Sequence, residues 1–408
     1  MNLTLLVGAR PNFMKAAPIL REVAKRDGVT AELVHSGQHY DAKMSDVFFE
    51  QLGLPRPDVN LGVGSGSHAE QTAAVMVKLE KLIMEKDPAT RPDWLVVVGD
   101  VNSTMAGAIA AAKLHVRVAH VEAGLRSFDR EMPEEINRMV TDAIADLLLT
   151  TEEAGNANLK REGHPDERVV FVGNVMIDTL RYCLASAQAL DIRPLVGQTP
   201  SSVLRPPSSG TSTARHDPGP AHTMDVPEDG RRKTEDGRRF TPEAPPYALL
   251  TMHRPSNVDD KHTLTRLVGA FEKIAADIRI VFPAHPRTRK RLDEFGLTER
   301  MAASARIIEP VGYIEMLALQ KSAQMLLTDS GGMQEESTVL GVPCLTMRNN
   351  TERPCTLELG TSELVGNDTD KLLEAAGRVL DGTWKTGRVP PLWDGRAAER
   401  IVDALVAR

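Results

Sequence analysis

The segment DSGGMQEE at 329–336 combines residue types that bind an anion at the start of a helix. It follows an apolar run at 325–327 and precedes a helical pattern, so we expect a strand, a glycine turn and a helix start. Gly331 and Gly332 let a ligand approach the backbone without interference from a Cβ atom. The N–H groups and positive dipole end of the helix favour a diphosphate, and Glu336 lies one turn on, where it could accept ribose hydroxyls. Such a helix start is also ordinary turn chemistry.

Charged side chains at other predicted strand ends could surround such a ligand, because doubly wound sheets bind ligands at the carboxyl ends of their strands. Arg10 closes the first predicted strand and Lys15 follows one helical turn later. Both suit phosphate oxygens, although a loop arginine and an exposed helix lysine would look the same. Asp100 ends the third predicted strand, where it is either a site residue or a helix cap.

Two glutamates in the first half are candidate acids or bases. Glu122 follows the strongly apolar strand predicted at 117–121, and partial burial there would raise its pKa towards a useful range. The alternative is a structural ion pair between Glu122 and Arg126. Glu134 belongs to the segment PEEINR, in which proline and acids in the first turn are ordinary at a helix start. Glu134 and Arg138 also have the i,i+4 spacing of a helical ion pair.

In the second half, His253 follows a predicted strand at 248–251 and is a candidate acid, base or phosphate donor. An isolated histidine at a strand end is more often structural, and His285 is a weaker candidate. Arg353 follows a predicted strand at 342–347, so it could reach a diphosphate from a loop.

Short apolar segments alternate with helical patterns along most of the chain, which predicts parallel sheets covered by helices. We therefore expect an α/β fold with two doubly wound, Rossmann-like domains facing a cleft. The predicted strands are 3–7, 31–35, 94–98, 117–121, 146–150 and 169–172 in the first half, and 248–251, 279–283, 306–308, 324–328 and 342–347 in the second, with helices including 68–86 and 103–114.

Residues 196–245 interrupt this alternation. They are rich in Pro, Ser, Gly and charge, and from 205 to 245 the only Val, Ile, Leu or aromatic residues are Val226 and Phe240. Such a segment cannot bury enough apolar surface to offset its ordering entropy, so we expect disorder. The predicted organisation is an N-terminal domain at 1–180, a connection at 181–195, this insertion, a nucleotide-binding domain at 246–380, and a C-terminal segment at 381–408 whose helix, near 392–407, packs back on the N-terminal domain.

Bulk composition excludes several classes of protein. The 408 residues exceed a single core, and the net charge of −7 argues against nucleic-acid or anionic membrane surfaces. The three cysteines, Cys183, Cys344 and Cys355, are widely spaced and form no metal or disulfide pattern. The N-terminus begins with the first predicted strand and carries no leader pattern, and no run reaches the length of a membrane helix. These features predict a cytoplasmic protein without a metal.

The chain carries the motifs GARPNFMKAAP (8–18), SGQHYD (36–41), VVVGDVNST (96–104), HVEAGLRS (120–127), MPEEINR (132–138), VGNVMID (172–178), TMHRPSN (251–257), LTDSGGMQEE (327–336) and MRNNTERP (347–354). Taken jointly, these motifs resemble those of the non-hydrolysing UDP-N-acetylglucosamine 2-epimerases. The resemblance covers about nine-tenths of the chain and omits the insertion. It implies two doubly wound domains of the kind shared with many nucleotide-sugar glycosyltransferases (GT-B-like), a cytosolic homodimer, and no cofactor. A departure is Ala74, which stands where the best-known members carry an arginine for a second, activating substrate molecule.

The resemblance also implies roles for individual residues. It implies C2 epimerisation of UDP-N-acetylglucosamine to UDP-N-acetylmannosamine through a 2-acetamidoglucal. Three alternatives stay open: a glycosyltransferase of the same architecture, an epimerase for a related UDP-sugar such as a uronate, and a non-catalytic nucleotide-sugar sensor. The implied catalytic residues are Asp100, Glu122, Glu134 and His253, and the implied substrate contacts are Arg10, Lys15, Ser330, Gly331, Gly332, Glu336 and Arg353.

Overall fold

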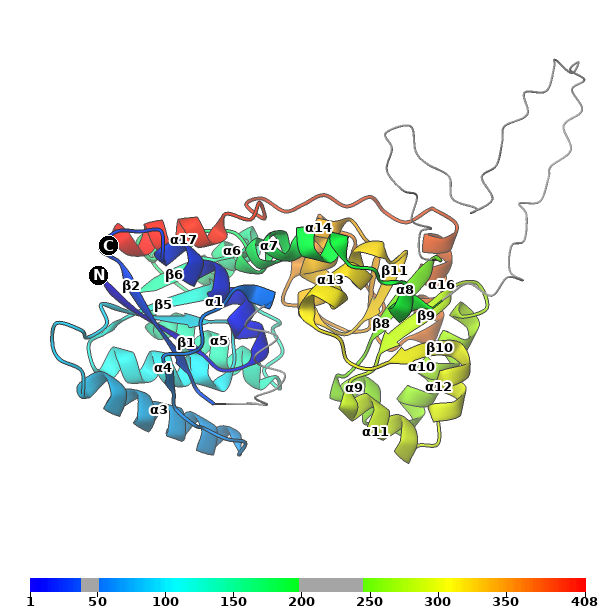
Figure 1. Cartoon of the computed structure of the whole chain (residues 1–408), viewed down its shortest axis with the longest axis horizontal. Helices are drawn as coiled ribbons and strands as arrows, with labels where there is room; N and C mark the ends of the chain where they lie inside the picture. The colour runs from blue at the N-terminus through cyan, green and yellow to red at the C-terminus, as the bar shows by residue number, and fades with distance from the viewer. Residues whose placement is uncertain (38–50, 198–244) are drawn as a thin grey trace, which may run out of the picture.

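Two parallel β-sheets form the frame of the protein in the computed structural model (Figure 1). The structure describes residues 1–37, 51–197 and 245–408. The first sheet has the strand order β3-β2-β1-β4-β5-β6-β7 and the second has the order β10-β9-β8-β11-β12-β13. Strand order reverses beside β1 in the first sheet and beside β8 in the second, as expected for doubly wound sheets. The predicted fold class is confirmed.

The first sheet contains β1 (Asn2–Val7), β2 (Thr30–His35), β3 (Val59–Asn60), β4 (Trp94–Val98), β5 (Arg117–Ala123), β6 (Leu147–Thr150) and β7 (Val169–Phe171). The second contains β8 (Tyr247–Thr251), β9 (Arg279–Pro283), β10 (Ala305–Ile308), β11 (Met325–Thr328), β12 (Cys344–Thr346) and β13 (Ser362–Leu364). The predicted bounds of β4 and β9 are confirmed, whereas β3 and β13 were not predicted. These two strands have only two and three residues, too few for a periodic pattern.

Helices cover both faces of each sheet. In the first half they are α1 (Arg10–Val23), α3 (His68–Met84), α4 (Asn102–Lys113), α5 (Pro133–Ile144), α6 (Glu153–Arg161), α7 (Val175–Ala189) and α8 (Arg193–Val196). In the second half they are α9 (Pro255–Val258), α10 (Lys261–Ile274), α11 (Pro286–Glu294), α12 (Thr298–Ser304), α13 (Tyr313–Ser322), α14 (Gly331–Leu340), α15 (Pro354–Glu358), α16 (Thr369–Leu380) and α17 (Ala397–Val406). Helix α8 reaches one residue into the predicted insertion at 196–245, most of which lies outside the described residues.

The strands are apolar on both faces because helices bury both faces. All five residues of β4, WLVVV, are buried, and their side chains alternate between two apolar clusters. Trp94, Val96 and Val98 belong to the cluster that includes α1, and Leu95 and Val97 belong to the cluster under α3 and α4. A third apolar cluster packs strands of the second sheet against helices that include α10 and α16.

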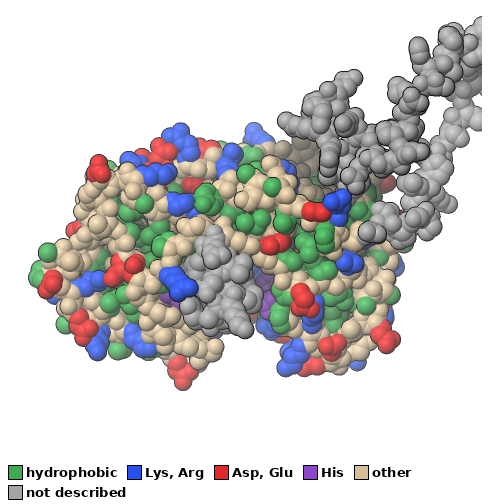
Figure 2. All heavy atoms as spheres, in the orientation of Figure 1, with side chains coloured by type: hydrophobic (Ala, Val, Ile, Leu, Met, Phe, Trp, Pro, Cys, Tyr) green, Lys and Arg blue, Asp and Glu red, His purple; other side chains and the backbone are tan. Residues whose placement is uncertain are grey.

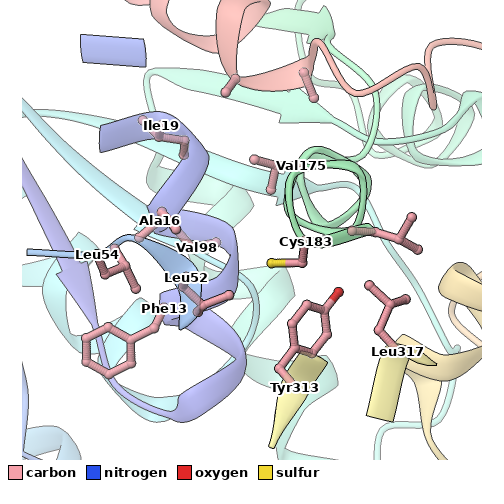
Figure 3. Packing of buried hydrophobic residues seen from close by; sticks show 14 of the residues in the cluster. Phe13, Ala16, Ile19, Leu52, Leu54, Val98, Val175, Cys183, Tyr313 and Leu317 are labelled. Atoms are coloured by element: carbon pink, nitrogen blue, oxygen red, sulfur yellow. The ribbon is translucent and has the colours of Figure 1, made fainter. Parts of the chain in front are cut away.

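The two domains share apolar packing on one side of the cleft. Helix α7 contacts both α13 and α14. Figure 3 shows Cys183 of α7 facing Tyr313 and Leu317 of α13, and all three belong to one buried cluster. The contact holds the carboxyl ends of the two sets of strands towards each other.

After α16 the chain returns to the first domain (Figure 1). Trp393 is buried against Ile177 and Cys355, and its Nε1 donates to Thr151 O at 2.9 Å. Helix α17 then packs against α1 and α7. Its first backbone N–H groups donate to the buried carboxylate of Asp178, which acts as a helix cap from another element.

The surface drawn in Figure 2 mixes basic, acidic and apolar side chains over both lobes. Among the helices that the structure describes, none has the length and apolar composition needed to cross a membrane.

We expect Trp393→Ala to lower the free energy of unfolding by about 3–5 kcal/mol, the usual range for deleting a buried aromatic side chain. Trp393→Phe keeps an aromatic ring but loses the hydrogen bond to Thr151, so we expect a loss of about 1–2 kcal/mol. Urea denaturation followed by circular dichroism measures both. Val389→Ala, at a side chain that is 44% exposed in the same segment, is the control and should change stability by less than about 0.5 kcal/mol. Equal effects of Trp393→Ala and Val389→Ala would contradict the docking of this segment.

Candidate active site

A cleft of about 410 Å³ lies between the carboxyl ends of the two sheets. Of the eleven residues predicted for the site, ten line it, and the side chain of Arg10 lies outside the described part of the chain. The ten are Lys15, Asp100, Glu122, Glu134, His253, Ser330, Gly331, Gly332, Glu336 and Arg353. A larger groove of about 1100 Å³ near the starts of β9 and β10 contains none of these side chains.

Glu122 enters the cleft because β5 is irregular at this residue. Its φ angle is +74°, in the left-handed region that non-glycine residues rarely adopt, and the register between β5 and β6 shifts between Val121 and Ala123. A bulge of this kind changes the direction of a side chain. Opposite it, Gly99 leaves the space that Lys15 needs, since a Cβ atom there would lie 3.2 Å from Lys15 Nζ.

The buried Glu122 carboxylate is bound by cations from both domains. Lys15 Nζ pairs with Oε2, and Arg353 Nη2 lies 3.3 Å from Oε1. Burial acts to raise the pKa of Glu122, but Lys15 and Arg353 outweigh it and hold the pKa below its usual value. The carboxylate is therefore ionised at neutral pH, as a general base requires.

Arg126 does not pair with Glu122, so the structural ion pair considered from sequence is wrong. Arg126 Nη2 instead lies 2.8 Å from Asp142 Oδ2 and 2.6 Å from Glu162 Oε2. Asp142 also accepts from Gly124 N and lies 2.6 Å from His120 Nδ1. This buried group fixes the backbone on both sides of Glu122.

Helix α5 contributes two adjacent glutamates, Glu134 and Glu135. Arg138 pairs with Asp100 and lies 2.6 Å from Glu135 Oε2, so it does not use Glu134 as its i,i+4 partner. Glu135 is buried and accepts from the N–H groups of Ser127 and Phe128, whereas Glu134 is exposed in the cleft. Of the adjacent glutamates, one organises a loop and the other faces the site.

The opposite wall of the cleft is organised by Asp329, which the sequence did not single out. Its carboxylate accepts from His253 N at 2.9 Å and from Arg254 N at 2.8 Å, and His253 Nδ1 lies 3.2 Å from Oδ1. Burial acts to raise the pKa of Asp329, but the contacts with His253 and with the backbone N–H groups lower it. The aspartate therefore directs the His253 side chain at the end of β8.

The predicted glycine turn begins α14. Ser330 is the residue before the helix, and Gly331 and Gly332 form its first turn. A Cβ atom on Gly331 would lie 2.9 Å from Glu352 Oε1, so a larger residue there would displace the Glu352 side chain. The backbone N–H groups of the first turn have no helical partner and can bind an anion.

Glu336 lines the cleft and is held by two neutral donors. Tyr313 donates its hydroxyl to Oε1 at 2.8 Å, and Gln320 donates Nε2 to Oε2 at 2.6 Å. Burial raises the pKa of Glu336. Tyr313 and Gln320 were not predicted, because nothing in an apolar helical pattern marks them as partners of a site carboxylate.

Arg353 is the centre of a buried group that sequence reasoning missed in part. Its Nε lies 2.5 Å from Glu335 Oε1, and Asn174 donates Nδ2 to the same oxygen at 2.9 Å. Burial and the charge of Glu122 raise the pKa of Glu335 to about 7, against the opposing effect of Arg353. The pair Glu335 and Glu336 near the start of α14 was the available signal in the sequence, but only Glu336 was predicted as a site residue.

Among the described residues, no group of three or more His, Cys, Asp or Glu side chains has an arrangement that could hold a metal ion.

The chain is similar over most of its length to proteins of one family. The profile of the family described as UDP-N-acetylglucosamine 2-epimerase matches residues 21–202 and 225–406. A UDP-N-acetylglucosamine 2-epimerase of Methanocaldococcus jannaschii is 41% identical, with 99% of each sequence covered. A UDP-2,3-diacetamido-2,3-dideoxy-D-glucuronate 2-epimerase of Pseudomonas aeruginosa is 35% identical, again with 99% of each covered. The crystal structure of a Methanocaldococcus jannaschii UDP-GlcNAc 2-epimerase with UDP-GlcNAc and UDP aligns with a TM-score of 0.80, 39% identity and 100% of each chain covered.

We expect Asp142→Asn to lower the free energy of unfolding at pH 7 by about 3–5 kcal/mol, because it leaves Arg126 buried without one of its carboxylates. Burial acts to raise the pKa of Asp142, but His120 and Arg126 hold it below its usual value. A carboxyl with a lowered folded pKa stabilises the protein above its unfolded pKa and loses that effect as the pH falls through the folded value. The difference between the two proteins should therefore narrow below about pH 4.

Urea denaturation from pH 3 to pH 8 measures this dependence. Asp146→Asn is the matched control, because Asp146 is an exposed carboxylate that accepts only a backbone N–H, that of Val118, in the described contacts. Asp146→Asn should lower the free energy of unfolding by about 1 kcal/mol or less. If the difference in the free energy of unfolding between the wild-type protein and Asp142→Asn stayed constant down to pH 3, Asp142 would not act as an ionised carboxylate.

Proposed function

This chain belongs to the UDP-N-acetylglucosamine 2-epimerase family, and we propose that it inverts C2 of UDP-N-acetylglucosamine to give UDP-N-acetylmannosamine without hydrolysis. The observation that carries the proposal is the division of one cleft into two walls. Carboxylates from the first domain, Asp100, Glu122 and Glu134, face a helix start and the cation Arg353 from the second. This arrangement suits proton transfer on one side and retention of a diphosphate on the other.

The chemistry explains why both walls are needed. The C2 hydrogen of an N-acetylhexosamine is not adjacent to a carbonyl, so simple removal of the proton is too difficult. Cleavage of the C1–O bond to UDP together with loss of the C2 proton gives a 2-acetamidoglucal. Return of a proton to the other face of C2 and re-addition of UDP at C1 complete the inversion. UDP must stay bound between the two steps.

The second domain supplies the proposed nucleotide contacts. The N–H groups at Gly331 and Gly332 would bind phosphate oxygens at the start of α14, with Ser330 beside them. Arg353 would add a charge-assisted hydrogen bond, and Glu336 would accept from ribose hydroxyls. From the first domain, Arg10 and Lys15 would approach the same diphosphate, and for Arg10 this assignment rests on the sequence motif.

The proposed catalytic groups are Asp100, Glu122, Glu134 and His253. Glu122 suits a general base because its cationic neighbours keep it ionised. Glu134 is exposed and lines the cleft, so it is placed to act on the sugar as an acid or base. Asp100, paired with Arg138, suits stabilisation of positive charge at C1. His253, next to the helix start, is suited to donate to the departing phosphate.

Members of the family are named for different UDP-sugar substrates. The Pseudomonas relative is named for a diacetamido uronate, so an epimerase of a related UDP-sugar is the second candidate. A glycosyltransferase or a non-catalytic sensor would leave the cluster of acids and bases without a use. The homodimer and the cytoplasmic location implied by the resemblance stay predictions, and Ala74 puts activation by a second substrate molecule in doubt.

We expect incubation with UDP-N-acetylglucosamine in heavy water to introduce deuterium at C2 of both recovered substrate and product, because the proposed route exchanges that proton. Proton NMR over a time course measures the exchange. The same assay with the UDP-diacetamido uronate compares kcat/KM for the two substrate classes. Hydrogen fully retained at C2 through many turnovers would contradict the elimination route. A higher kcat/KM for the uronate would reassign the substrate while leaving the C2 chemistry in place.

We expect Glu122→Gln to reduce turnover by about 100-fold or more, the usual loss for a general acid or base, with little change in UDP affinity. Arg353→Ala should instead weaken UDP binding by about 1.5–3 kcal/mol, the range for a lost charge-assisted hydrogen bond. It should also release glucal and free UDP, because the leaving nucleotide is held less firmly. Calorimetry with UDP and chromatography of products separate these outcomes.

Arg300→Ala is the control for the removal of an arginine, since Arg300 pairs with Glu272 on the surface and should leave UDP binding unchanged. Thermal melting of each variant checks folding. Normal turnover in a folded Glu122→Gln protein would remove that residue from the mechanism.

A further inference from the structure

Arg353 lies between two carboxylates, one from each domain. Its Nε is 2.5 Å from Glu335 Oε1 and its Nη2 is 3.3 Å from Glu122 Oε1. The three side chains are buried. The remaining nitrogen, Nη1, is also buried and has no hydrogen-bond partner among the described residues. Arg353 therefore has an unused donor, while its charge is already matched by carboxylates.

The four groups joined by these ion pairs are balanced in charge when every one is ionised, and Glu152 and Glu352 add further negative charge near Arg353. Glu122 and Glu335 carry the negative charges, and Lys15 and Arg353 carry the positive ones. A diphosphate that takes hydrogen bonds from Arg353 adds negative charge to this group. Buried charge without a partner is unfavourable, and protonation of a carboxyl is the usual response of such a site. We therefore expect either Glu122 or Glu335 to become neutral when a diphosphate binds.

Of the two carboxyls paired with Arg353, Glu335 is the better suited to do so. Burial, together with the charge of Glu122, raises its pKa to about 7, whereas Lys15 and Arg353 hold Glu122 ionised despite its burial. Asn174 donates to Glu335 Oε1, and a neutral carboxyl can still accept this bond through its carbonyl oxygen. The groups that face Glu335 from the surrounding elements are Lys15, Glu122, Asn174, Tyr313, Arg353 and Cys355.

We propose that Glu335 is a positioning residue that takes up a proton from solvent when a nucleotide diphosphate enters the cleft, and so frees Arg353 to bind phosphate oxygens. The inference rests on the proposed function, because it treats Arg353 as a ligand of the diphosphate. Glu335 then acts through Arg353 and need not touch the sugar. In its ionised form it holds the guanidinium at the interface between the domains, and in its neutral form it lets that group turn towards the nucleotide.

The test is calorimetry of the full chain with the β-methyl ester of UDP, whose phosphates do not titrate near neutrality and which has no sugar to react. Titrations in buffers of different ionisation enthalpy, from pH 6 to pH 8.5, give the number of protons taken up. We expect about one proton at pH 8 and about a tenth of that at pH 6, where Glu335 is already neutral. Because binding takes up a proton, the Kd should rise by up to about tenfold per pH unit above pH 7.

Glu335→Gln should abolish the uptake and give a Kd that is independent of pH in this range, an effect that a purely structural role would not produce. His253→Gln is the matched comparison, since His253 is another titratable group in the cleft, and it should retain the uptake. Thermal melting checks the folding of both variants, and the uptake by the wild-type protein tests the inference without any variant.

Binding of the probe to the wild-type protein without proton uptake at pH 8 would overturn this inference and leave the proposed function in place. Uptake that persists in folded Glu335→Gln, or that is lost in His253→Gln instead, would assign the proton elsewhere and also overturn it. Failure of the probe to bind the wild-type protein would overturn both this inference and the proposed function.

Discussion

The ion pairs of Arg353 with Glu122 and Glu335 are the interactions on which the site depends. Charges buried between two domains must be matched there, because unpaired charges in the interior are strongly unfavourable. Glu122 comes from the first domain, and Arg353 and Glu335 come from the second. Each domain supplies one cation and one carboxylate, Lys15 with Glu122 and Arg353 with Glu335, and the contact of Arg353 with Glu122 joins the two pairs. The same contacts therefore assemble the cleft and set the protonation of its carboxylates.

The fold makes this meeting possible through the geometry of parallel sheets. In a doubly wound sheet the loops that follow the strands gather at one edge, and the packing of α7 against α13 and α14 turns the two edges towards each other. The return of the chain through Trp393 adds a second connection between the domains. The site residues follow strands or lie in the first two turns of helices, as Lys15, Glu134 and Glu336 do.

That regularity is why much of the protein could be predicted from sequence. Apolar runs identified most of the strands. Residues at strand ends and helix starts, together with the family resemblance, identified ten residues that line the cleft. Local spacing was a poor guide to partners. Arg126 and Arg138 both have a glutamate four residues earlier, yet both bind carboxylates elsewhere. The bulge at Glu122, the role of Asp329 and the contact from Asn174 to Glu335 depend on tertiary structure, which no local pattern encodes.

The arrangement also links binding to catalysis through shared partners. Lys15 and Arg353, the cations proposed for the diphosphate, are the groups that bind Glu122 in the structure. A phosphate that shares these cations weakens, without removing, the attraction that holds the pKa of Glu122 low. Its basicity must then increase as the nucleotide binds, before the C2 proton is removed. A catalytic carboxylate paired in this way is a weak base while the cleft contains no anion and a stronger base once the substrate is bound.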